Sequence, residues 1–469
     1  MRKRSLFTAT LLAALLPAFA AASDASVEFP PGDAGERAAG YVAAFNSPDE
    51  TVLAAFLAAN LAPEALERMP VEGRMVTLRR IREDAGTIEL AKVTPGRDGG
   101  IVVIARGSTG VWFEMAFVFE QEPPYRLVGV RWNILPEAPD LDAPDTPFTE
   151  AELVKELSAH LDGLVAKDAF SGVVLVAKGE TPVFRKAYGL ASKEYGAPNR
   201  EDTRFNLGSL NKLFTRIAIE QLAGAGKLSF DDTIDTFLPD YPNRDAAAKV
   251  TVRHLLEMTS GIGDFFGEKY AATPKNLIRD LEDYLPLFAS DPLEFEPGTG
   301  NTYSNGGYVV LGLIIAKASG RSYFDYVRDN ICAPAGMTAT GHLETDVPAP
   351  NVASGYTFGW DFEEHPNEPR RNNVYTRPCR GSSAGGGYST VDDLLRLVLA
   401  LGAGKLSAPE AARTASEQGM AVGGGAPGMN AFLETLPASG YTVIVLSNYD
   451  PPAAMSVGRM IGGLINRLP

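Results

Sequence analysis

Residues 205–215 read FNLGSLNKLFT, and this stretch decides how the second half of the chain is interpreted. Ser209 and Lys212 are three residues apart at the start of an amphipathic helix that we predict to run to about Ala223. Residues at this spacing share a helix face, so the Lys212 amine can reach the Ser209 hydroxyl. Backbone N–H groups at a helix start can also stabilise an oxyanion. The spacing indicates a lysine-activated serine, although an N-cap serine with a solvated lysine would share it.

A second segment, EPGTGNTYSNGGY at residues 296–308, precedes an apolar helix predicted over residues 309–318. Tyr303 and Asn305 flank a single residue on this loop, so both side chains can point into one cleft. A phenol near an ammonium group can carry protons, and an amide can orient both a lysine and a substrate carbonyl. The alternative is that both side chains only satisfy the loop backbone.

Strand and turn signals lie on both sides of these segments. Residues 171–177 and 182–188 predict one hairpin, and residues 429–436 and 441–447 predict another. Thr149 and Glu152 form a capping box at the start of a helix over residues 148–164, and residues 457–468 close the chain as a helix. Strands at both ends with helices between them imply one sheet built from both ends of this region.

Together these segments resemble the superfamily of class C β-lactamases and penicillin-binding proteins. TVRHLLEMTSG at 251–261, APAGM at 333–337 and GGGYST at 385–390 are similar to family motifs, in the family's order, over residues 148–469. The resemblance implies an α/β (α+β) fold of the β-lactamase/transpeptidase type, with an antiparallel sheet flanked by helices and a helical subdomain. It also implies roles for four residues: Ser209 as nucleophile, Lys212 as proton acceptor, Tyr303 as proton relay, and Asn305 as the group that holds lysine and substrate.

The third family motif departs from the pattern. The family has Lys or His, a small residue and Gly on a strand beside the cleft, whereas this chain has VGGGAPGM at 422–429. Val422 stands at the position of the cation, and Gly423 and Gly424 follow it as expected substrate-binding positions. The resemblance assigns the oxyanion hole to the backbone N–H groups of Ser209 and Gly425. Since the missing cation would bind a substrate carboxylate, we expect substrate recognition to differ from that of the family.

Four arginines, at positions 370, 371, 377 and 380, follow in one predicted loop. Such a run is usually a solvated basic surface. The other interpretation is that one of them replaces the lost contact with a carboxylate.

A competing hydrolase motif occurs at residues 381–385, where GSSAG fits the Gly-x-Ser-x-Gly elbow of α/β-hydrolases. That elbow needs an apolar strand before the serine and a helix directly after it, with a histidine downstream. Neither element is predicted here, and all four histidines lie upstream. We therefore predict a Gly/Ser loop lining the cleft, and we interpret His254 as a capping or packing residue.

The N-terminus has the pattern of an export signal over residues 1–22: three basic residues, an apolar stretch over residues 6–16 and small residues for cleavage. An uncleaved anchor is the alternative, but the stretch is short for a membrane span. We therefore expect a periplasmic or secreted protein without a stable membrane anchor after cleavage. Two cysteines, Cys332 and Cys379, would then meet an oxidising compartment, and the sequence leaves open whether they are bridged.

Residues 23–135 predict a small α+β domain, with helices over 33–46 and 49–60 followed by strands at 75–82, 87–93, 101–106, 111–119 and 125–132. The element order is similar to that of cystatin-like domains. Aromatic residues such as Phe113 and Phe117 are expected in its core. A Pro-rich linker at 136–147 separates it from the second domain.

Composition excludes several functional classes. The chain has 469 residues, 45% hydrophobic and 22% charged, which excludes global disorder and a polytopic membrane protein. Its net charge of −15 argues against a nucleic-acid partner. Four histidines and two cysteines show no ligand spacing, so we expect no metal and no cofactor.

The sequence as a whole predicts an exported serine hydrolase that forms an acyl-enzyme on a small ester or amide. An esterase-like or weak peptidase or β-lactamase activity is favoured, because Val422 removes the usual anion contact; peptidoglycan-derived substrates fit the resemblance. The alternative is a degenerate, non-catalytic member that binds cell-wall fragments or a protein partner.

Overall fold

A computed structural model describes residues 27–96, 99–135, 138–139, 141, 148–359, 365 and 367–468. Contacts between Cα atoms divide the chain into two compact units, with the division between residues 146 and 147. The predicted export signal lies outside the described residues. Within the described part of the chain, no helix has the length and apolar character needed to cross a membrane.

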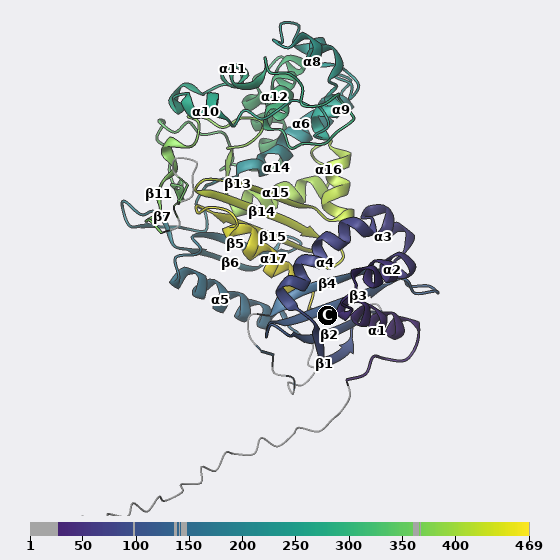
Figure 1. The fold of residues 1–469 in the computed structure, drawn as a ribbon. Helices are drawn as coiled ribbons and strands as arrows, with labels where there is room; N and C mark the ends of the chain where they lie inside the picture. The colour runs from purple at the N-terminus through teal and green to yellow at the C-terminus, as the bar shows by residue number, and fades with distance from the viewer. Residues whose placement is uncertain are drawn as a thin grey trace, which may run out of the picture. The chain divides into compact units, whose positions relative to one another are not determined.

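The N-terminal unit has helices α1 (Asp33–Asn46), α2 (Glu50–Asn60), α3 (Pro63–Arg68) and α4 (Val71–Ala85). A four-stranded antiparallel sheet follows, in the order β1 (Ile88–Pro95), β2 (Ile101–Gly107), β3 (Trp112–Phe119) and β4 (Leu127–Leu135). Alternating residues of β2 and β3 are buried, including Phe113 and Phe117, against the aromatic face of α1. The predicted α+β architecture is confirmed (Figure 1).

One predicted strand is wrong. Residues 75–82 lie inside helix α4 rather than in a strand. Met75, Leu78 and Ala85 are buried, and these positions are three and seven residues apart, which places them on one helix face. The β-branched Val76 and Thr77 suggested a strand, but Val76 is half exposed and contributes little to the core.

The C-terminal unit contains a five-stranded antiparallel sheet in the order β13-β14-β15-β5-β6. Its strands are β5 (Gly172–Lys178), β6 (Thr181–Tyr188), β13 (Ala421–Ala426), β14 (Met429–Leu436) and β15 (Tyr441–Ser447). The two predicted hairpins join where β15 pairs with β5, in a register that sets Ser447 opposite Gly172. The prediction of one sheet built from both ends of the region is therefore confirmed. Figure 1 shows β13 at the edge of the sheet that faces the helices of this unit.

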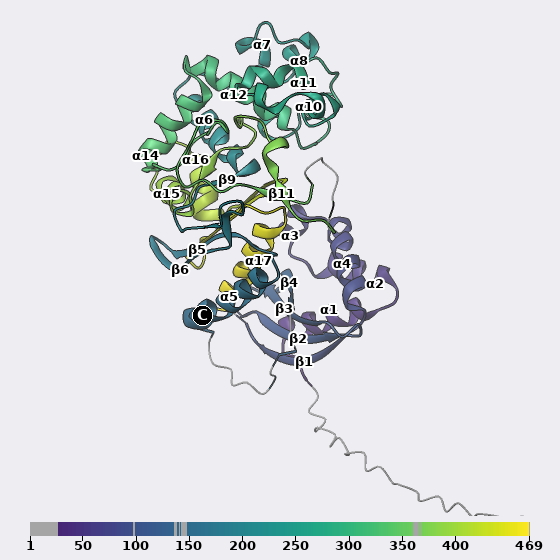
Figure 2. The same ribbon diagram turned by 90° about the vertical axis from the view of Figure 1, so that its left-hand side faces the viewer.

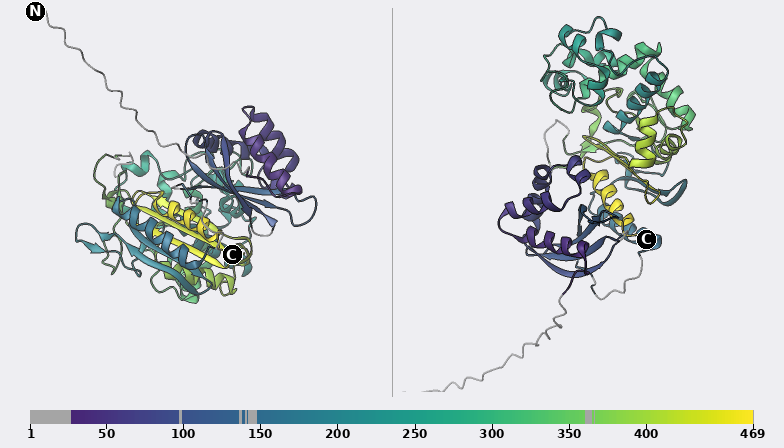
Figure 3. Two further views of the ribbon diagram at one scale, coloured as in Figure 1. Left: turned by 90° about the horizontal axis from the view of Figure 1, so that it is seen from below. Right: turned by 90° about the vertical axis from the view of Figure 1, so that its right-hand side faces the viewer.

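Two terminal helices cover one face of this sheet. They are α5 (Glu150–Ala166) and α17 (Ala453–Ile465), and the left view of Figure 3 shows both over the strands. The Thr149–Glu152 capping box that the sequence predicts begins α5. Buried leucines of α5 share an apolar cluster with Val457 and Ile461 of α17 and with outward-facing residues of β5 and β15.

The other helices of the unit pack around the opposite face and beyond the β13 edge, which Figure 1 labels; Figure 2 shows the same helices from the side. Two of them meet at the centre of the largest core: α6 (Lys212–Gly224) and α12 (Asn305–Ser319), which is buried from Asn305 to Ile315. The remaining helices are α7 (Ile234–Phe237), α8 (Arg244–Lys249), α9 (Val252–Leu256), α10 (Glu268–Ala272), α11 (Leu285–Phe288), α13 (Tyr323–Val327), α14 (Ala333–Ala335), α15 (Val391–Gly402) and α16 (Pro409–Arg413).

Short strand pairs connect these layers. They are β7 (Leu190–Ser192) with β8 (Ala197–Pro198), β9 (Phe205–Asn206) with β12 (Tyr388–Ser389), and β10 (Tyr356–Thr357) with β11 (Arg371–Asn372). The β9–β12 pair lies directly before the 3-10 turn η2 (Gly208–Asn211) that leads into α6. This pair therefore holds the loop at residues 381–387 next to the start of α6.

Candidate active site

Ser209 lies in the η2 turn at the start of α6, as its motif predicts. Its hydroxyl oxygen accepts a hydrogen bond from the Tyr303 hydroxyl at 2.7 Å and one from the Lys212 ammonium at 3.3 Å. Two motifs that are almost a hundred residues apart in the chain thus meet at one serine oxygen. Such an arrangement, with a base and an acid on one hydroxyl, is the geometry of an activated nucleophile.

Lys212 is buried, and its ammonium group lies among neutral oxygen atoms. It donates to Asn305 Oδ1 at 2.6 Å and to the carbonyl oxygen of Ala384 at 2.6 Å. Burial lowers the pKa of Lys212 to about 7, while the negative charge of Asp264 acts in the opposite direction. A large fraction of this amine is therefore neutral at pH 7 and able to accept a proton, unlike an exposed lysine.

Tyr303 differs from Lys212 in its protonation state. Its ring is half exposed, yet its hydroxyl points to Ser209. Burial raises the pKa of Tyr303 above its ordinary value, and the hydrogen bond with Ser209 opposes this shift. The phenol is therefore protonated at neutral pH and begins as a proton donor. The two groups on Ser209 are thus an amine that can take a proton and a phenol that can give one.

Asn305, at the first turn of α12, is held in one orientation by two charged groups. Its Oδ1 accepts from Lys212, and its Nδ2 donates to Asp264 Oδ2 at 2.7 Å. Asp264 also accepts from the backbone N–H of Phe266 at 2.9 Å. Neither Asp264 nor the Ala384 carbonyl was identified from the sequence. Asp264 belongs to no motif that we recognised, and a backbone carbonyl leaves no side-chain signal.

The edge strand β13 approaches the nucleophile very closely at two glycines. A Cβ atom built on Gly424 would lie 2.0 Å from the Leu207 carbonyl oxygen and 2.8 Å from the Ser209 nitrogen. A Cβ on Gly208, whose φ is +51°, would lie 2.7 Å from the Gly425 nitrogen. The backbone nitrogens of Ser209 and Gly425 therefore lie at one contact between strand and turn, where two N–H donors can serve one oxyanion.

Asn430 fixes this edge strand in place. Its side chain is buried, its Nδ2 donates to the Gly424 carbonyl oxygen at 2.8 Å, and its Oδ1 accepts from the backbone N–H of Ala454 at 2.7 Å. The amide thus links β13 to helix α17. The buried hydrogen bond from Asn430 therefore holds Gly424 close to the turn that contains Ser209.

Val422 is placed differently from the two glycines after it. Gly423 and Gly424 line the cavity, as predicted, but Val422 does not. Its side chain is partly buried and packs against the main apolar core. The expectation that position 422 contacts substrate is therefore corrected, because an isopropyl group gains more from the core than from the polar end of the cleft.

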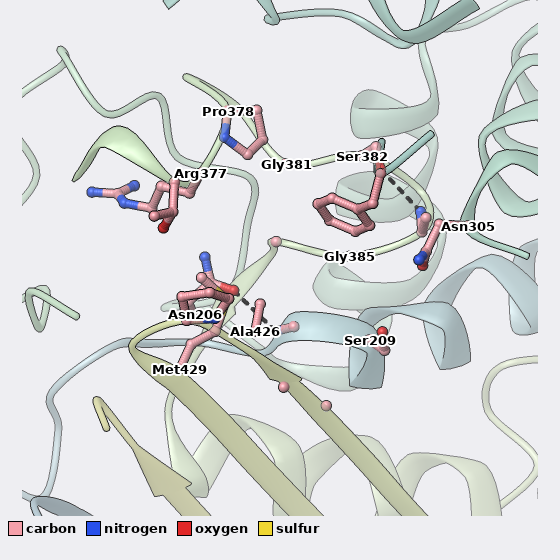
Figure 4. A pocket seen from close by; sticks show the side chains of 18 of the residues that line it. Asn206, Ser209, Asn305, Arg377, Pro378, Gly381, Ser382, Gly385, Ala426 and Met429 are labelled. Carbon is pink, nitrogen blue, oxygen red and sulfur yellow. Dashed lines mark hydrogen bonds between the residues drawn. The ribbon is translucent and has the colours of Figure 1, made fainter. Parts of the chain in front are cut away.

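A cavity of about 650 Å³ opens beside Ser209, within the C-terminal unit (Figure 4). One wall is aromatic: the ring centroid of Phe265 lies 4.5 Å from that of Phe266 and 4.8 Å from that of Tyr284. Met429 and Met455 contribute apolar surface on the side of the sheet and α17. A cavity of this size with mostly apolar walls can hold a small organic substrate.

The competing motif at 381–385 forms part of this cavity as a loop. Gly381, Ser382, Ala384 and Gly385 line it, and no strand leads into the motif from residues 373–380, which form a 3-10 turn and a loop. The Ser383 hydroxyl donates to the carbonyl oxygen of Tyr308 inside the core. The predicted cleft-lining Gly/Ser loop is confirmed.

His254 caps a helix, as the sequence indicates. Its Nδ1 accepts from the backbone N–H of Thr251 at the start of α9.

Cys332 and Cys379 are buried and unpaired, so the question of a bridge is answered in favour of two free thiols.

Cys379 lies next to two acidic residues, Glu344 and Asp346, and the ligand atoms of the three residues lie within 4.8 Å of one another. Arg279 forms ion pairs with both carboxylates, at 2.8 Å to Glu344 and 2.5 Å to Asp346. The cluster is thus an ion-pair network in which the negative charges already have a cationic partner.

The lowered pKa of Lys212 predicts how an activity that depends on Ser209 would vary with pH. Only the neutral amine can accept the serine proton, so kcat/KM for a neutral ester is expected to rise with pH and to level off above a midpoint of about 7. Because Asp264 raises the pKa of Lys212, Asp264→Asn is expected to move the midpoint to lower pH. The check is a pH–rate profile between about pH 5.5 and 8.5 for both proteins. A flat profile would contradict the role of Lys212 as the base.

Comparison with known proteins shows which family this chain resembles. A model of the Beta-lactamase family matches residues 157–443, more than half of the chain. Penicillin-binding protein 4* of Bacillus subtilis is 34% identical over 257 residues, which are 53% of this chain and 55% of that protein. The match thus spans about half the length of that relative.

The matches to two further proteins span a larger share of those proteins. Esterase EstB of Burkholderia gladioli is 29% identical over 318 residues, or 61% of this chain and 79% of that protein. The crystal structure of a penicillin-binding protein from Bacillus halodurans superposes with a TM-score of 0.58 at 32% identity. That superposition covers 65% of this chain and the whole of the other chain.

Proposed function

The chain belongs to the Beta-lactamase family. From this premise, and from its similarity to an esterase, we propose that it is itself a serine hydrolase that acts on a small ester or amide. The observation that supports the proposal most is the pair of contacts on Ser209. One is with an amine whose pKa is lowered to about 7, and the other is with a protonated phenol. A structural serine would need neither.

In the acylation step, Ser209 Oγ attacks the carbonyl carbon while its proton passes to Lys212 Nζ. The negative charge that forms on the carbonyl oxygen is stabilised by the backbone N–H groups of Ser209 and Gly425. When the tetrahedral intermediate collapses, the leaving group takes the hydroxyl proton of Tyr303. The phenolate then regains a proton from the Lys212 ammonium, which contacts the same Ser209 oxygen as the Tyr303 hydroxyl.

Deacylation uses the same groups in the reverse order. Water attacks the acyl-serine carbonyl while Tyr303 takes the water proton and passes its own proton to the neutral Lys212 amine. Ser209 regains a proton when the acid product forms. No other reactant is required, since the released alcohol or amine and the acid account for all the atoms of substrate and water. Asn305 keeps Lys212 in place throughout, because its oxygen accepts from the lysine in both protonation states.

Among the family's reactions, we favour ester hydrolysis, or weak peptidase or β-lactamase activity. Val422 places an apolar side chain where the family has a cation, so a carboxylate beside the scissile bond lacks its usual partner. The apolar walls of the cavity favour substrates with an uncharged group at that point. Peptidoglycan-derived esters or amides remain within this class.

We also propose export to the periplasm or the medium, which N-terminal sequencing of the mature protein from cell fractions would test.

The experiment is covalent labelling with a fluorophosphonate probe, followed by intact-mass analysis. We expect a single adduct on the wild type and none on Ser209→Ala. Absence of an adduct on the wild type, or an equal adduct on Ser209→Ala, would refute the proposal. The result would then favour the second candidate, a non-catalytic protein that binds cell-wall fragments or a protein partner, which the apolar Val422 supports. Stabilisation by peptidoglycan fragments without any hydrolysis would establish that alternative.

A further inference from the structure

Arg377 has an unusual position among the four arginines of the loop at 370–380. The other three have carboxylate partners: Arg370 pairs with Asp450 at 3.1 Å, Arg371 with Glu368 at 3.3 Å, and Arg380 lies 3.9 Å from both Asp280 and Glu344. Arg377 has no such partner among the described residues. Its Nη1 donates to the neutral hydroxyl of Tyr388 at 3.0 Å, which leaves the charge and most of its five N–H donors available.

Arg377 is also the one residue with a charged side chain at neutral pH among the described residues that line the catalytic cavity. The remaining walls are aromatic, aliphatic, glycine or neutral polar residues, and no lining residue is acidic. Arg377 itself is only partly exposed. A cation in a largely apolar cavity without a carboxylate partner attracts an anion more strongly than one on an open surface.

A second donor, Asn206, lines the same cavity as Arg377. Asn206 of β9 pairs directly with Tyr388 of β12, the residue that holds the arginine. Side chains of directly opposed residues in an antiparallel pair project from the same face. The Asn206 Oδ1 accepts from the backbone N–H of Gly208, so its amide nitrogen is directed away from that bond, toward the cavity that the residue lines. Arg377 and Asn206 are thus both connected to Tyr388, the first through a side-chain hydrogen bond and the second through strand pairing, and both line the cleft.

This group is remote from the nucleophile. Figure 4 shows Arg377 and Ser209 on opposite sides of the pocket, with Asn206 between them in the view. The family's cation position at 422, by contrast, belongs to the strand that contacts the serine turn. The two locations would therefore suit carboxylates at different distances from the scissile bond.

We infer that Arg377, assisted by Asn206, binds a carboxylate carried by the substrate at a site remote from the scissile bond. The inference rests on the proposed hydrolase function and specifies its substrate class: esters or amides of bifunctional acids or alcohols that end in a carboxylate. A guanidinium can hold such a group through two parallel N–H donors while Ser209 attacks at the other end of the cleft.

The test uses matched ester pairs that differ only in charge. Mono-p-nitrophenyl esters of dicarboxylic acids from adipic to suberic acid are compared with their methyl-capped neutral forms, and a second series carries the carboxylate on the alcohol side. The quantity measured is the ratio of kcat/KM for the charged and the neutral ester. Since a charge-assisted hydrogen bond contributes to binding, Arg377→Gln is expected to lower this ratio about tenfold to a hundredfold at the preferred length. Arg371→Gln, whose exposed arginine pairs with Glu368, is the matched control and is expected to leave the ratio unchanged.

A conservative variant separates charge from packing. Arg377→Lys keeps the charge but loses the planar fork, and it is expected to retain part of the preference. A ratio that is the same in the wild type and Arg377→Gln at every chain length, on both the acyl and the alcohol side, would overturn the inference while leaving the hydrolase intact.

Direct binding distinguishes this inference from the proposed function. Ser209→Ala cannot turn over, so calorimetry on this variant measures binding of adipate monomethyl ester alone. Binding that is lost in the double variant Ser209→Ala/Arg377→Gln would support the carboxylate site even if the protein proved not to hydrolyse esters. Equal binding by the single and double variants would contradict it.

Discussion

Replacement of Lys212 with methionine is expected to lower kcat/KM for a neutral activated ester by about 10²–10⁴-fold, the range of a general base. Methionine fills the space of the lysine stem but cannot take the Ser209 proton. It also leaves Asn305 Oδ1 and the Ala384 carbonyl without their donor. Steady-state kinetics over a series of ester concentrations measures the effect, and a thermal melt shows whether the fold is kept.

Two further variants sharpen this prediction. Lys212→Arg keeps a positive charge that cannot be removed at working pH, so it is expected to be as inactive as the methionine variant. Lys227→Met changes an exposed lysine just beyond α6 and is the matched control, with activity equal to that of the wild type. Wild-type activity in a folded Lys212→Met protein would remove the lysine from the mechanism.

The second large effect concerns Tyr303 and depends on the leaving group. If Tyr303 donates a proton to the departing alkoxide or amine, Tyr303→Phe should slow acylation by alkyl esters or amides about 10²–10⁴-fold. The p-nitrophenolate ion needs no proton, so acylation by a p-nitrophenyl ester with the same acyl group should change much less. The measurement is the single-turnover acylation rate with both substrates.

A matched tyrosine controls for the loss of a hydroxyl group in general. Tyr195 is 89% exposed in a loop of the same unit, and Tyr195→Phe is expected to behave as the wild type with both substrates. An equal loss with the alkyl and the aryl ester in Tyr303→Phe would show that the phenol acts on Ser209 itself rather than on the leaving group.

Local signals explain why much of the fold is predictable. The hairpins that contribute β5, β6, β14 and β15 are identified from the sequence alone, because each has a short turn between two strand-forming runs. The runs in β5 and β15 are continuously apolar. Helix α4 was predicted incorrectly because β-branched residues are found in both states and only burial on one face distinguishes them. The pairing of β15 with β5, across most of the domain, follows from topology rather than from any local pattern.

Some residues of the candidate site are likewise recognisable from local sequence segments, whereas others are identified only from contacts in the folded chain. Ser209, Lys212, Tyr303 and Asn305 belong to recognisable segments with side chains suited to their chemistry, so their positions are predictable. Asp264 and the Ala384 carbonyl act through folding contacts that no spacing reveals.

The loop arginines show this limit most clearly. In the sequence they form only a basic segment. In the folded chain, Arg370 pairs with Asp450, and Arg380 lies near Asp280 and Glu344, so the partners come from distant segments. Only the folded chain shows that Arg377 lies in the cleft without such a partner among the residues that the structure describes. The orientation of Val422 toward the core is likewise a result of packing, since a valine in a strand can face either side.

The most direct test of the account is the time course of product release from a p-nitrophenyl ester under stopped-flow conditions, with mass analysis of protein quenched during the burst. We predict a burst of p-nitrophenol that approaches one equivalent per protein, and an acyl adduct that peptide mapping locates on Ser209. A linear time course without any adduct, or an adduct on another residue, would contradict the proposal that Ser209 is the nucleophile of this protein.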